Sequence, residues 1–348
     1  MNHLGLRIME FGFGLIACQR FPGDPRSDVE LYRDAVEVAV LAEQLGFDSV
    51  WVSEHHFVDD GYLPSLLPVA AAIAARTERV RIGTALLLAP LHDPVRLAED
   101  AAVVDLLSAG RLTLGLGLGW RREEFDGLGI PIRSRRRRLE DAIEILHQAW
   151  GDGLVTGTPA APYPGISVTP KPARPGGPPI WIGGFAEPAV RRAGRMADGF
   201  MGGEVTPDSL AEQVAWATEE LELAGRDPDT FEMSIYLPTF PWHGDDAWER
   251  VRDHHWYVDW KYADMDDARG RTGPPPPAPP IPPDREAAVR SAIVLGRPDE
   301  VAEQIGALNA AAGDRLHYIA RLDWPGMDPA VRNESMRIFA DEVVPLLR

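Results

Sequence analysis

The first half of the sequence alternates between two hydrophobic patterns, and this alternation restricts the possible folds more than any other feature. Short runs in which nearly every residue is apolar, such as 80–88 and 112–118, are typical of strands buried on both faces. Between such runs lie longer segments, such as 31–45, whose apolar residues recur every three or four positions, as in amphipathic helices. Strand–helix–strand alternation predicts parallel strands with helices packed outside them.

The sequence also marks where the first helix begins and ends. Ser27 and Glu30 have the spacing of a capping box, and Gly46 follows the last apolar position, where helices commonly end. The other helices predicted in the first half lie at 66–75, 94–107 and 135–150.

Eight strands are predicted in total, at 6–16, 48–53, 80–88, 112–118, 179–183, 199–203, 232–238 and 315–322. Eight strands favour a closed (β/α)₈ TIM barrel, an α/β fold, over an open doubly wound sheet. A barrel of this kind needs about 250 residues or more, so the 348 residues suit one domain with insertions.

Two segments rich in proline and glycine, 153–178 and 266–286, interrupt the alternation. The second contains GPPPPAPPIPP, which can form neither a helix nor a central strand. The strand and helix pattern resumes after each segment, so we interpret both as insertions within a single domain, 1–348. Insertions in barrel enzymes build and cover the active site at the carboxyl ends of the strands, and we expect both segments there.

The composition argues against several classes of partner. A formal net charge of −18 disfavours nucleic acid and anionic membranes. A single cysteine, Cys18, excludes an intramolecular disulfide and fits a reducing compartment, and we expect it to be a small buried residue. The sequence has no recognisable signal peptide and no apolar stretch of about 20 residues. We therefore expect a cytoplasmic protein.

Three adjacent ionisable residues, Glu54, His55 and His56, follow the second predicted strand. Adjacent side chains of an extended segment point to opposite sides, so the two histidines are poorly placed to bind one metal ion, and we expect no metal. Two interpretations remain open. The histidines are hydrogen-bonded polar residues at a strand end, or one is a catalytic acid–base group where barrel enzymes place their chemistry.

Alternating glycines close the fourth predicted strand in the sequence GLGLGW. Gly115, Gly117 and Gly119 share one face of the strand, which therefore lacks side chains. A flat aromatic ligand or close packing of the protein itself would explain such a face. The spacing is not that of a dinucleotide-binding fingerprint.

A further candidate site lies where the fifth predicted strand runs into Gly183 and Gly184, before a helix that begins near residue 187. Free backbone amides and the helix dipole would bind a phosphate there, although a plain turn also uses glycine.

In 133–138, five of six residues are arginines at the start of a helix, where cations oppose the dipole. A phosphate, partner carboxylates or a solvated face would account for them.

Three stretches, 45–57, 80–119 and 178–200, resemble the bacterial luciferase-like monooxygenases in order and spacing. The similarity extends over about residues 5–200. It implies a flavin-dependent (β/α)₈ enzyme with its flavin at the carboxyl ends of the strands. It also implies roles for individual residues. The catalytic residues are His55 beside the flavin, Glu54, and His56 as support or as a substrate contact. The cofactor-binding residues are Ala85, Leu86, Gly115, Gly117, Arg136 or a neighbouring arginine, Gly183, Gly184 and Phe185.

The resemblance implies a cis peptide bond between Ala85 and Leu86, beneath the isoalloxazine ring. One departure concerns the Cys-Arg pair of the luciferase alpha subunit, which is replaced here by Gly117 and Leu118. Light emission from a long-chain aldehyde is therefore not expected.

The reaction implied by the resemblance is oxygenation of a small organic substrate by O₂ and reduced FMN, which a separate flavin reductase supplies. We expect the enzyme to be a homodimer. Two alternatives remain open: a hydride-transfer oxidoreductase that uses the deazaflavin coenzyme F420, and a non-catalytic flavin-binding subunit. The Glu-His-His-Phe sequence favours the monooxygenase.

Overall fold

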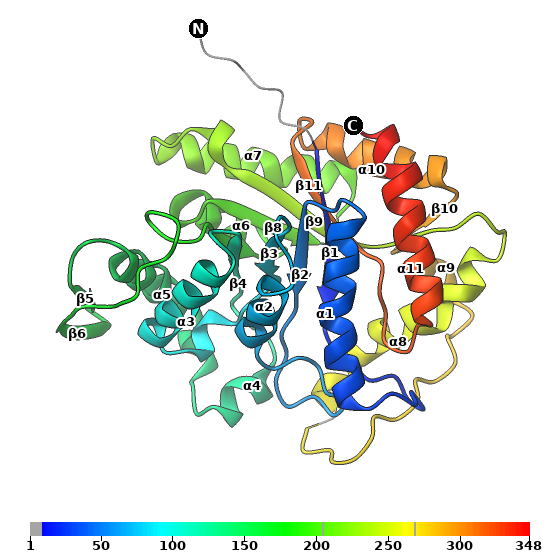
Figure 1. Ribbon diagram of the computed structural model, residues 1–348, viewed down its shortest axis with the longest axis horizontal. Helices are drawn as coiled ribbons and strands as arrows, with labels where there is room; N and C mark the ends of the chain where they lie inside the picture. The colour runs from blue at the N-terminus through cyan, green and yellow to red at the C-terminus, as the bar shows by residue number, and fades with distance from the viewer. Residues whose placement is uncertain (1–8, 204, 268) are drawn as a thin grey trace, which may run out of the picture.

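Eight parallel strands form a closed barrel in the computed structural model, which describes residues 9–203, 205–267 and 269–348 (Figure 1). The barrel closes because β9 pairs with both β8 and β11, which confirms the predicted fold class. The strands, in chain order, are β1 (Glu10–Ile16), β2 (Ser49–Val52), β3 (Arg81–Thr84), β4 (Leu112–Leu116), β7 (Ile180–Gly183), β8 (Gly199–Gly203), β9 (Glu232–Pro241) and β11 (Leu316–Arg321).

Helices surround the barrel, and their ends follow the sequence signals. Ser27 and Glu30 form the predicted capping box, and Gly46 has a φ of 84°. No helix in the described ranges is long and apolar enough to cross a membrane. The helices of the outer layer are α1 (Asp28–Gln44), α2 (Leu66–Ala74), α3 (Pro94–Leu107), α5 (Arg135–Trp150), α6 (Glu187–Met196), α7 (Pro207–Leu223), α10 (Pro298–Ala311) and α11 (Pro329–Ile338).

The centre of the barrel is filled by large apolar side chains. Trp51 and Trp181 stack with ring centroids 4.9 Å apart, and Ile319 packs in the same cluster. Gly83 lies beside this pair, where any side chain would collide with the Trp51 ring. The barrel is therefore a packed core, and only its two ends can carry polar chemistry.

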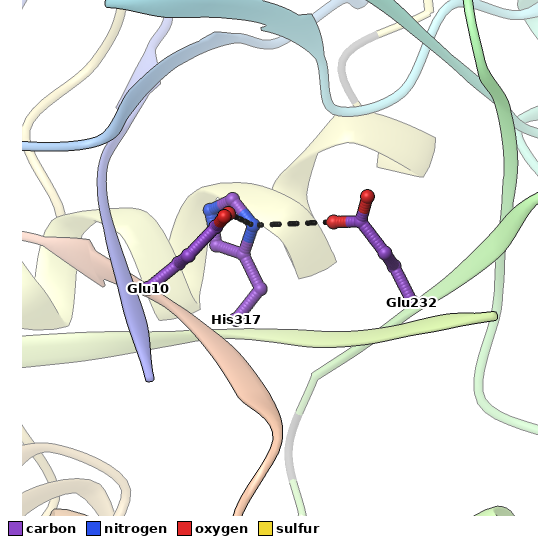
Figure 2. Close-up of side chains that lie close together, drawn as sticks. All are labelled: Glu10, Glu232 and His317. Carbon is purple, nitrogen blue, oxygen red and sulfur yellow. Dashed lines mark ion pairs between the residues drawn. The ribbon is translucent and has the colours of Figure 1, made fainter. Parts of the chain in front are cut away.

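A charge network lies at the amino-terminal end of the barrel, and Figure 2 shows three of its members, Glu10, Glu232 and His317. Arg81 contacts Glu10 at 2.7 Å and Glu232 at 2.8 Å. His317 Nδ1 lies 3.1 Å from Glu10, and its Nε2 lies 2.7 Å from Ser49 Oγ. The two carboxylates and the imidazole are close enough to ligate a metal ion, but Arg81 already occupies one oxygen of each carboxylate. We infer a structural role.

This network shifts the ionisation of its carboxyl groups. Burial alone raises the pKa of Glu232, but the nearby His317 ring and the hydrogen-bonded Arg81 outweigh burial and lower the pKa to about 2. The pKa of Glu10 is lowered for the same reasons. Because the folded pKa lies below the ordinary 4.5, Glu232 contributes stability above pH 4.5 that is lost as the pH falls toward 2.

We predict that Glu232→Gln lowers the free energy of unfolding at pH 7 by about 1–3 kcal/mol. The difference from wild type should shrink between pH 4.5 and 2, because the wild-type carboxylate is being protonated in this window. Urea unfolding at several pH values measures this difference. Glu212→Gln, at an exposed position of α7, is the control and should show no such convergence. A pH-independent gap would contradict the assignment.

The first insertion is not where we expected it. Residues 155–166 form an antiparallel hairpin of β5 (Val155–Thr158) and β6 (Ala161–Ile166), which stands at the left of Figure 1 beside α5. Gln148 of α5 binds the backbone of Gly157 through its amide group. The segment joins a helix to the next strand, so the expected origin at the carboxyl end of a strand is wrong. The proline and glycine content of the segment predicted an interruption of the strand and helix pattern, but it could not predict at which end of the barrel the segment lies.

The second insertion does lie over the carboxyl ends, as expected. It follows α8 (Ala247–Asp267) and precedes α9 (Glu286–Ser291) and β10 (Val294–Gly296), which extends the sheet beside the end of β9. Arg271 binds Asp59, in the loop after β2, at 3.1 Å. In Figure 1, α8 lies at the same lower end of the barrel as the short helix α4 (Arg122–Gly127).

Limited proteolysis should cut the two insertions, 153–178 and 266–286, before the rest of the chain, because these segments have few buried apolar contacts. Within the second insertion, residues 272–283 contain no helix or strand. Bound flavin should slow cleavage if the segment covers the site. Mass spectrometry of the first fragments tests this expectation, and initial cleavage within 80–119 would contradict it.

Candidate active site at the carboxyl ends of the strands

One buried carboxylate holds the segment that carries the two histidines. Glu124, on α4, accepts a hydrogen bond from the backbone N–H of His56 at 3.0 Å, and the same oxygen lies 2.8 Å from Nδ1 of His55. His55 is 6% exposed and Glu124 is fully buried. Both the ring and the backbone of the segment are therefore fixed by a residue that the sequence analysis did not identify.

The other histidine has its own carboxylate. His56 Nε2 lies 2.7 Å from Glu54 Oε1, and the second oxygen of Glu54 accepts the Leu88 N–H at 3.2 Å. His92 lies 3.7 Å from the same carboxylate. The rings of His55 and His56 thus contact different carboxylates, as expected for adjacent residues of an extended segment.

The pairing of Glu54 with His56 shifts both groups. Burial raises the pKa of Glu54, but the hydrogen bond from His56 and the nearby His92 ring outweigh it and hold the pKa below the ordinary 4.5. Burial lowers the pKa of His56, but the hydrogen bond to Glu54 outweighs it and raises the pKa above 6.5. The stabilisation from His56 is therefore fully present below pH 6.5 and is lost as the pH rises through the raised value.

We predict that Glu54→Gln lowers the pKa of His56, because burial then acts without a compensating carboxylate. The pKa is measured by NMR titration of the histidine ring signals. The ring signal of the exposed His147 serves as the reference in both proteins. An unchanged His56 titration would show that Glu54 is not its charge partner in solution.

Aromatic rings surround His55. Its ring meets Tyr62 edge-on, with centroids 4.8 Å apart, and lies 5.5 Å from Tyr262 and 6.0 Å from Trp120. The two tyrosine hydroxyls are 3.2 Å apart, and burial raises the pKa of both above 10.0. Trp120 is 45% exposed. We call His55, Tyr62, Trp120 and Tyr262 the aromatic wall. The wall is apolar except for neutral hydroxyls and His55.

The peptide bond between Ala85 and Leu86 is cis, which confirms the prediction, and a second non-prolyl cis bond, Gly14–Leu15, was not predicted. Leu86 lies two residues after the end of β3, and its side chain lies against the glycines. A Cβ on Gly117 would lie 3.0 Å from Leu86 Cβ, and one on Gly115 would collide with the Thr84 carbonyl. Packing, one of the two interpretations left open, accounts for both glycines.

The turn after β7 has the features of an anion site. A Cβ on Gly183 would collide with Leu86, while the Gly184 N–H donates to Met201 O at 3.1 Å. Phe185 is exposed. The N-cap residue of α6, Ala186, forms no side-chain capping bond. Pro188 has no N–H and the Ala189 N–H donates to Ala186 O at 2.8 Å, so the amides of residues 185–187 are those left without an acceptor within the described chain. Such a turn fits a phosphate.

The arginine run has divided roles. Arg136 is 72% exposed and lies 3.8 Å from Glu140, which also accepts a hydrogen bond from Arg192 of α6 at 3.0 Å. Arg138 instead donates to the carbonyl oxygens of Pro90 and His92, beyond the cis peptide. Among the described residues, Arg136 is therefore linked to α6 only through Glu140, whereas Arg138 orders the segment after β3.

A sequence model of the family described as luciferase-like monooxygenase matches residues 9–315, and the chain belongs to this family. It is therefore an oxidoreductase of the luciferase-like class, and its barrel and the cis bond after β3 agree with the resemblance seen in the sequence.

Relatives in this family carry out two kinds of reaction. The chain is 27% identical to 4-hydroxyprotoasukamycin monooxygenase of Streptomyces nodosus subsp. asukaensis, over 96% of this chain and 91% of that protein. It is 35% identical to an F420-dependent glucose-6-phosphate dehydrogenase of Microbacterium testaceum, over 63% of this chain and 68% of that protein. The alignment with an uncharacterised protein of Sinorhizobium fredii covers only 53% of the length of that protein.

Among solved structures, the monooxygenase RslO1 from Streptomyces bottropensis has a TM-score of 0.83 at 24% identity. The alignment covers 97% of this chain and 99% of that one. This similarity supports the barrel fold along the whole chain.

Proposed function

We propose that the protein is a flavin-dependent monooxygenase that uses reduced FMN and O₂ to oxygenate a small organic substrate. The observation that carries the proposal is the buried pair of His55 and Glu124, with the rings of the aromatic wall around His55 at the carboxyl ends of the strands. The relative named as a 4-hydroxyprotoasukamycin monooxygenase, aligned along 96% of this chain, supports it.

The residues present fit a flavin. The segment Ala85–Leu86 would lie beneath the ring system, and the turn of Gly184 and Phe185, with its uncapped helix, would hold the phosphate. Arg136 would add positive charge near that turn. When bound, the reduced flavin supplies the activation of O₂, and the protein supplies position and proton control.

His55 is the acid–base group in this proposal. Glu124 holds Nδ1, which fixes the orientation of the ring and leaves Nε2 to hold or move a proton. Nε2 has no hydrogen-bond partner among the residues that the structure describes. His56 and Glu54 position the segment from its other side. The helix α8, which carries Tyr262, helps to exclude water from the wall.

The reduced FMN would come from a separate flavin reductase, and we propose that the enzyme acts in the cytoplasm as a homodimer. A relative named as the oxygenase component of a trigonelline monooxygenase, from Acinetobacter baylyi, supports a two-component system. A second candidate function is hydride transfer with the deazaflavin coenzyme F420, which the F420-dependent relatives favour.

One experiment separates the two functions. The purified protein is mixed anaerobically with reduced FMN or with the reduced deazaflavin, binding is titrated, and O₂ is then admitted. We expect tight binding of reduced FMN and consumption of O₂. Binding of the deazaflavin alone would establish the second function, and failure of both to bind would support a non-catalytic role.

We predict that His55→Ala lowers the rate of single-turnover product formation with pre-reduced cofactor by about 10²–10⁴-fold, the usual contribution of general acid–base catalysis. Flavin affinity should remain, because the proposed phosphate site consists mainly of backbone amides. Glu124→Gln should lower the rate less and His56→Ala least, since these residues act through position.

Near-normal turnover of His55→Ala, with a large loss in His56→Ala, would reverse the two roles. Loss of folding in both variants, seen by circular dichroism, would instead assign the histidines a structural role.

A further inference from the structure

Arg321 ends the strand β11 and points into the mouth of the barrel. Alternate residues of a strand share a face, and the two preceding residues on this face are both inside the barrel. His317 bonds Ser49 at the amino-terminal end, and Ile319 packs against the central tryptophans. Arg321 therefore occupies the next layer up, at the carboxyl ends of the strands where the aromatic wall lies.

This arginine is buried without a direct ion pair. It is 5% exposed, and no carboxylate of the described residues lies within 4.0 Å of its guanidinium. Its Nε donates only a long hydrogen bond, of 3.4 Å, to the carbonyl of Asp323. Buried cations are normally paired, since removing a charge from water is unfavourable. The exception indicates a partner outside the protein.

Further unsatisfied groups lie beside it. Arg321 lines a cavity of about 40 Å³ together with Gln19 and Trp324. Gln19 Oε1 and Trp324 Nε1 are buried and form no hydrogen bond within the described chain. Of the carboxylates in the same lining, Asp34 is 2.6 Å and Asp323 is 3.7 Å from Arg332. The charge of Arg321 lowers the pKa of the buried Asp323, but no ion pair within 4.0 Å joins the two side chains.

The position of β11 separates this site from the proposed flavin site. The flavin residues follow β3 and β7, whereas β11 lies four strands from β4 in the closed order, on the opposite side of the mouth. A flavin ring system above β3, β4 and β7 would leave the half of the barrel mouth between β9 and β1 free for the substrate. The charge of Arg321 also lowers the pKa of Tyr62 and Tyr262, against the larger effect of burial.

We propose that Arg321 binds an anionic oxygen of the substrate, and that the substrate is an aromatic acid or a similarly planar oxyanion. The aromatic wall receives the ring, and the guanidinium receives the carboxylate through charge-assisted hydrogen bonds. This inference rests on the proposed function for the identity of the reaction, but the binding site itself is tested without flavin.

The test compares benzoate with its neutral counterpart benzamide, each titrated into flavin-free protein by ligand-observed NMR. We expect wild type to bind benzoate about 10- to 100-fold more tightly than benzamide, the range for a hydrogen bond to a charged group. Arg321→Gln should abolish this preference, and Arg321→Lys should keep part of it. Equal binding of both probes by wild type would overturn the proposal.

Thermal unfolding of the same variants tests a structural role. Arg321→Gln should leave the melting temperature unchanged or raise it, because it removes an unpaired buried charge. The matched control is Arg81→Gln, which removes a buried arginine that is paired with Glu10 and Glu232. It should lower the melting temperature and keep the preference for benzoate. A fall in the melting temperature of Arg321→Gln as large as that of the control would overturn the proposal.

A parallel titration with reduced FMN identifies the source of the anion. If Arg321→Gln weakens binding of reduced FMN and leaves the benzoate preference intact, the guanidinium serves the flavin and the proposal is wrong. If neither reduced FMN nor the reduced deazaflavin binds wild type, the proposed function fails, while the benzoate comparison still decides the role of Arg321.

Discussion

The carboxylate of Glu124 is the contact on which the candidate site depends. One of its oxygens binds both the ring of His55 and the backbone of His56, so a single buried group fixes two successive residues. This requires α4 to lie against the loop after β2. Arg121 helps to hold that arrangement, because its guanidinium binds carbonyl oxygens of His56 and of Met265 in α8. The loop after β2, the short helix α4 and the helix α8 therefore form one hydrogen-bonded assembly.

The two ends of the barrel manage charge differently. At the amino-terminal end, Arg81 and His317 contact both carboxylates of the network, which stabilises the folded state. At the carboxyl end, Arg321 has no described carboxylate within 4.0 Å, and one oxygen of Glu124 is buried without a hydrogen bond. Unsatisfied groups reduce stability, and they are retained where a ligand completes them. This asymmetry agrees with the usual division in barrels between a stabilising face and a reactive face.

Local signals in the sequence were enough to predict the barrel fold. The geometry of the site depends on contacts between residues that are distant in the sequence, which local signals do not predict. The helices at 94–107 and 135–150 were predicted with their observed ends, because periodicity and capping are local. Glu124 was missed because it meets His55 across 69 residues, and only the closed barrel brings α4 to that strand end. Gly115 and Gly117 showed that no side chain fits, but not that Leu86 and Thr84 fill the space. The insertion at 153–178 was misplaced because composition does not specify a side of the barrel.

The covering helix is tied to the segment that carries the histidines. Lys261 of α8 is fully buried and contacts Asp59 at 2.5 Å, three residues beyond His56, as well as Asp264 at 2.8 Å. Arg271 adds a second bond to Asp59 from the start of the insertion. Exposing the aromatic wall by lifting α8 would break the ion pairs that Lys261 and Arg271 form with the buried Asp59, where leaving one charge unpaired is costly. Because the same movement removes Tyr262 from His55, access to the wall and the environment of the acid–base group change together. A substrate that completes the pairing of Arg321 beneath this helix would therefore bind best when the wall is closed around it.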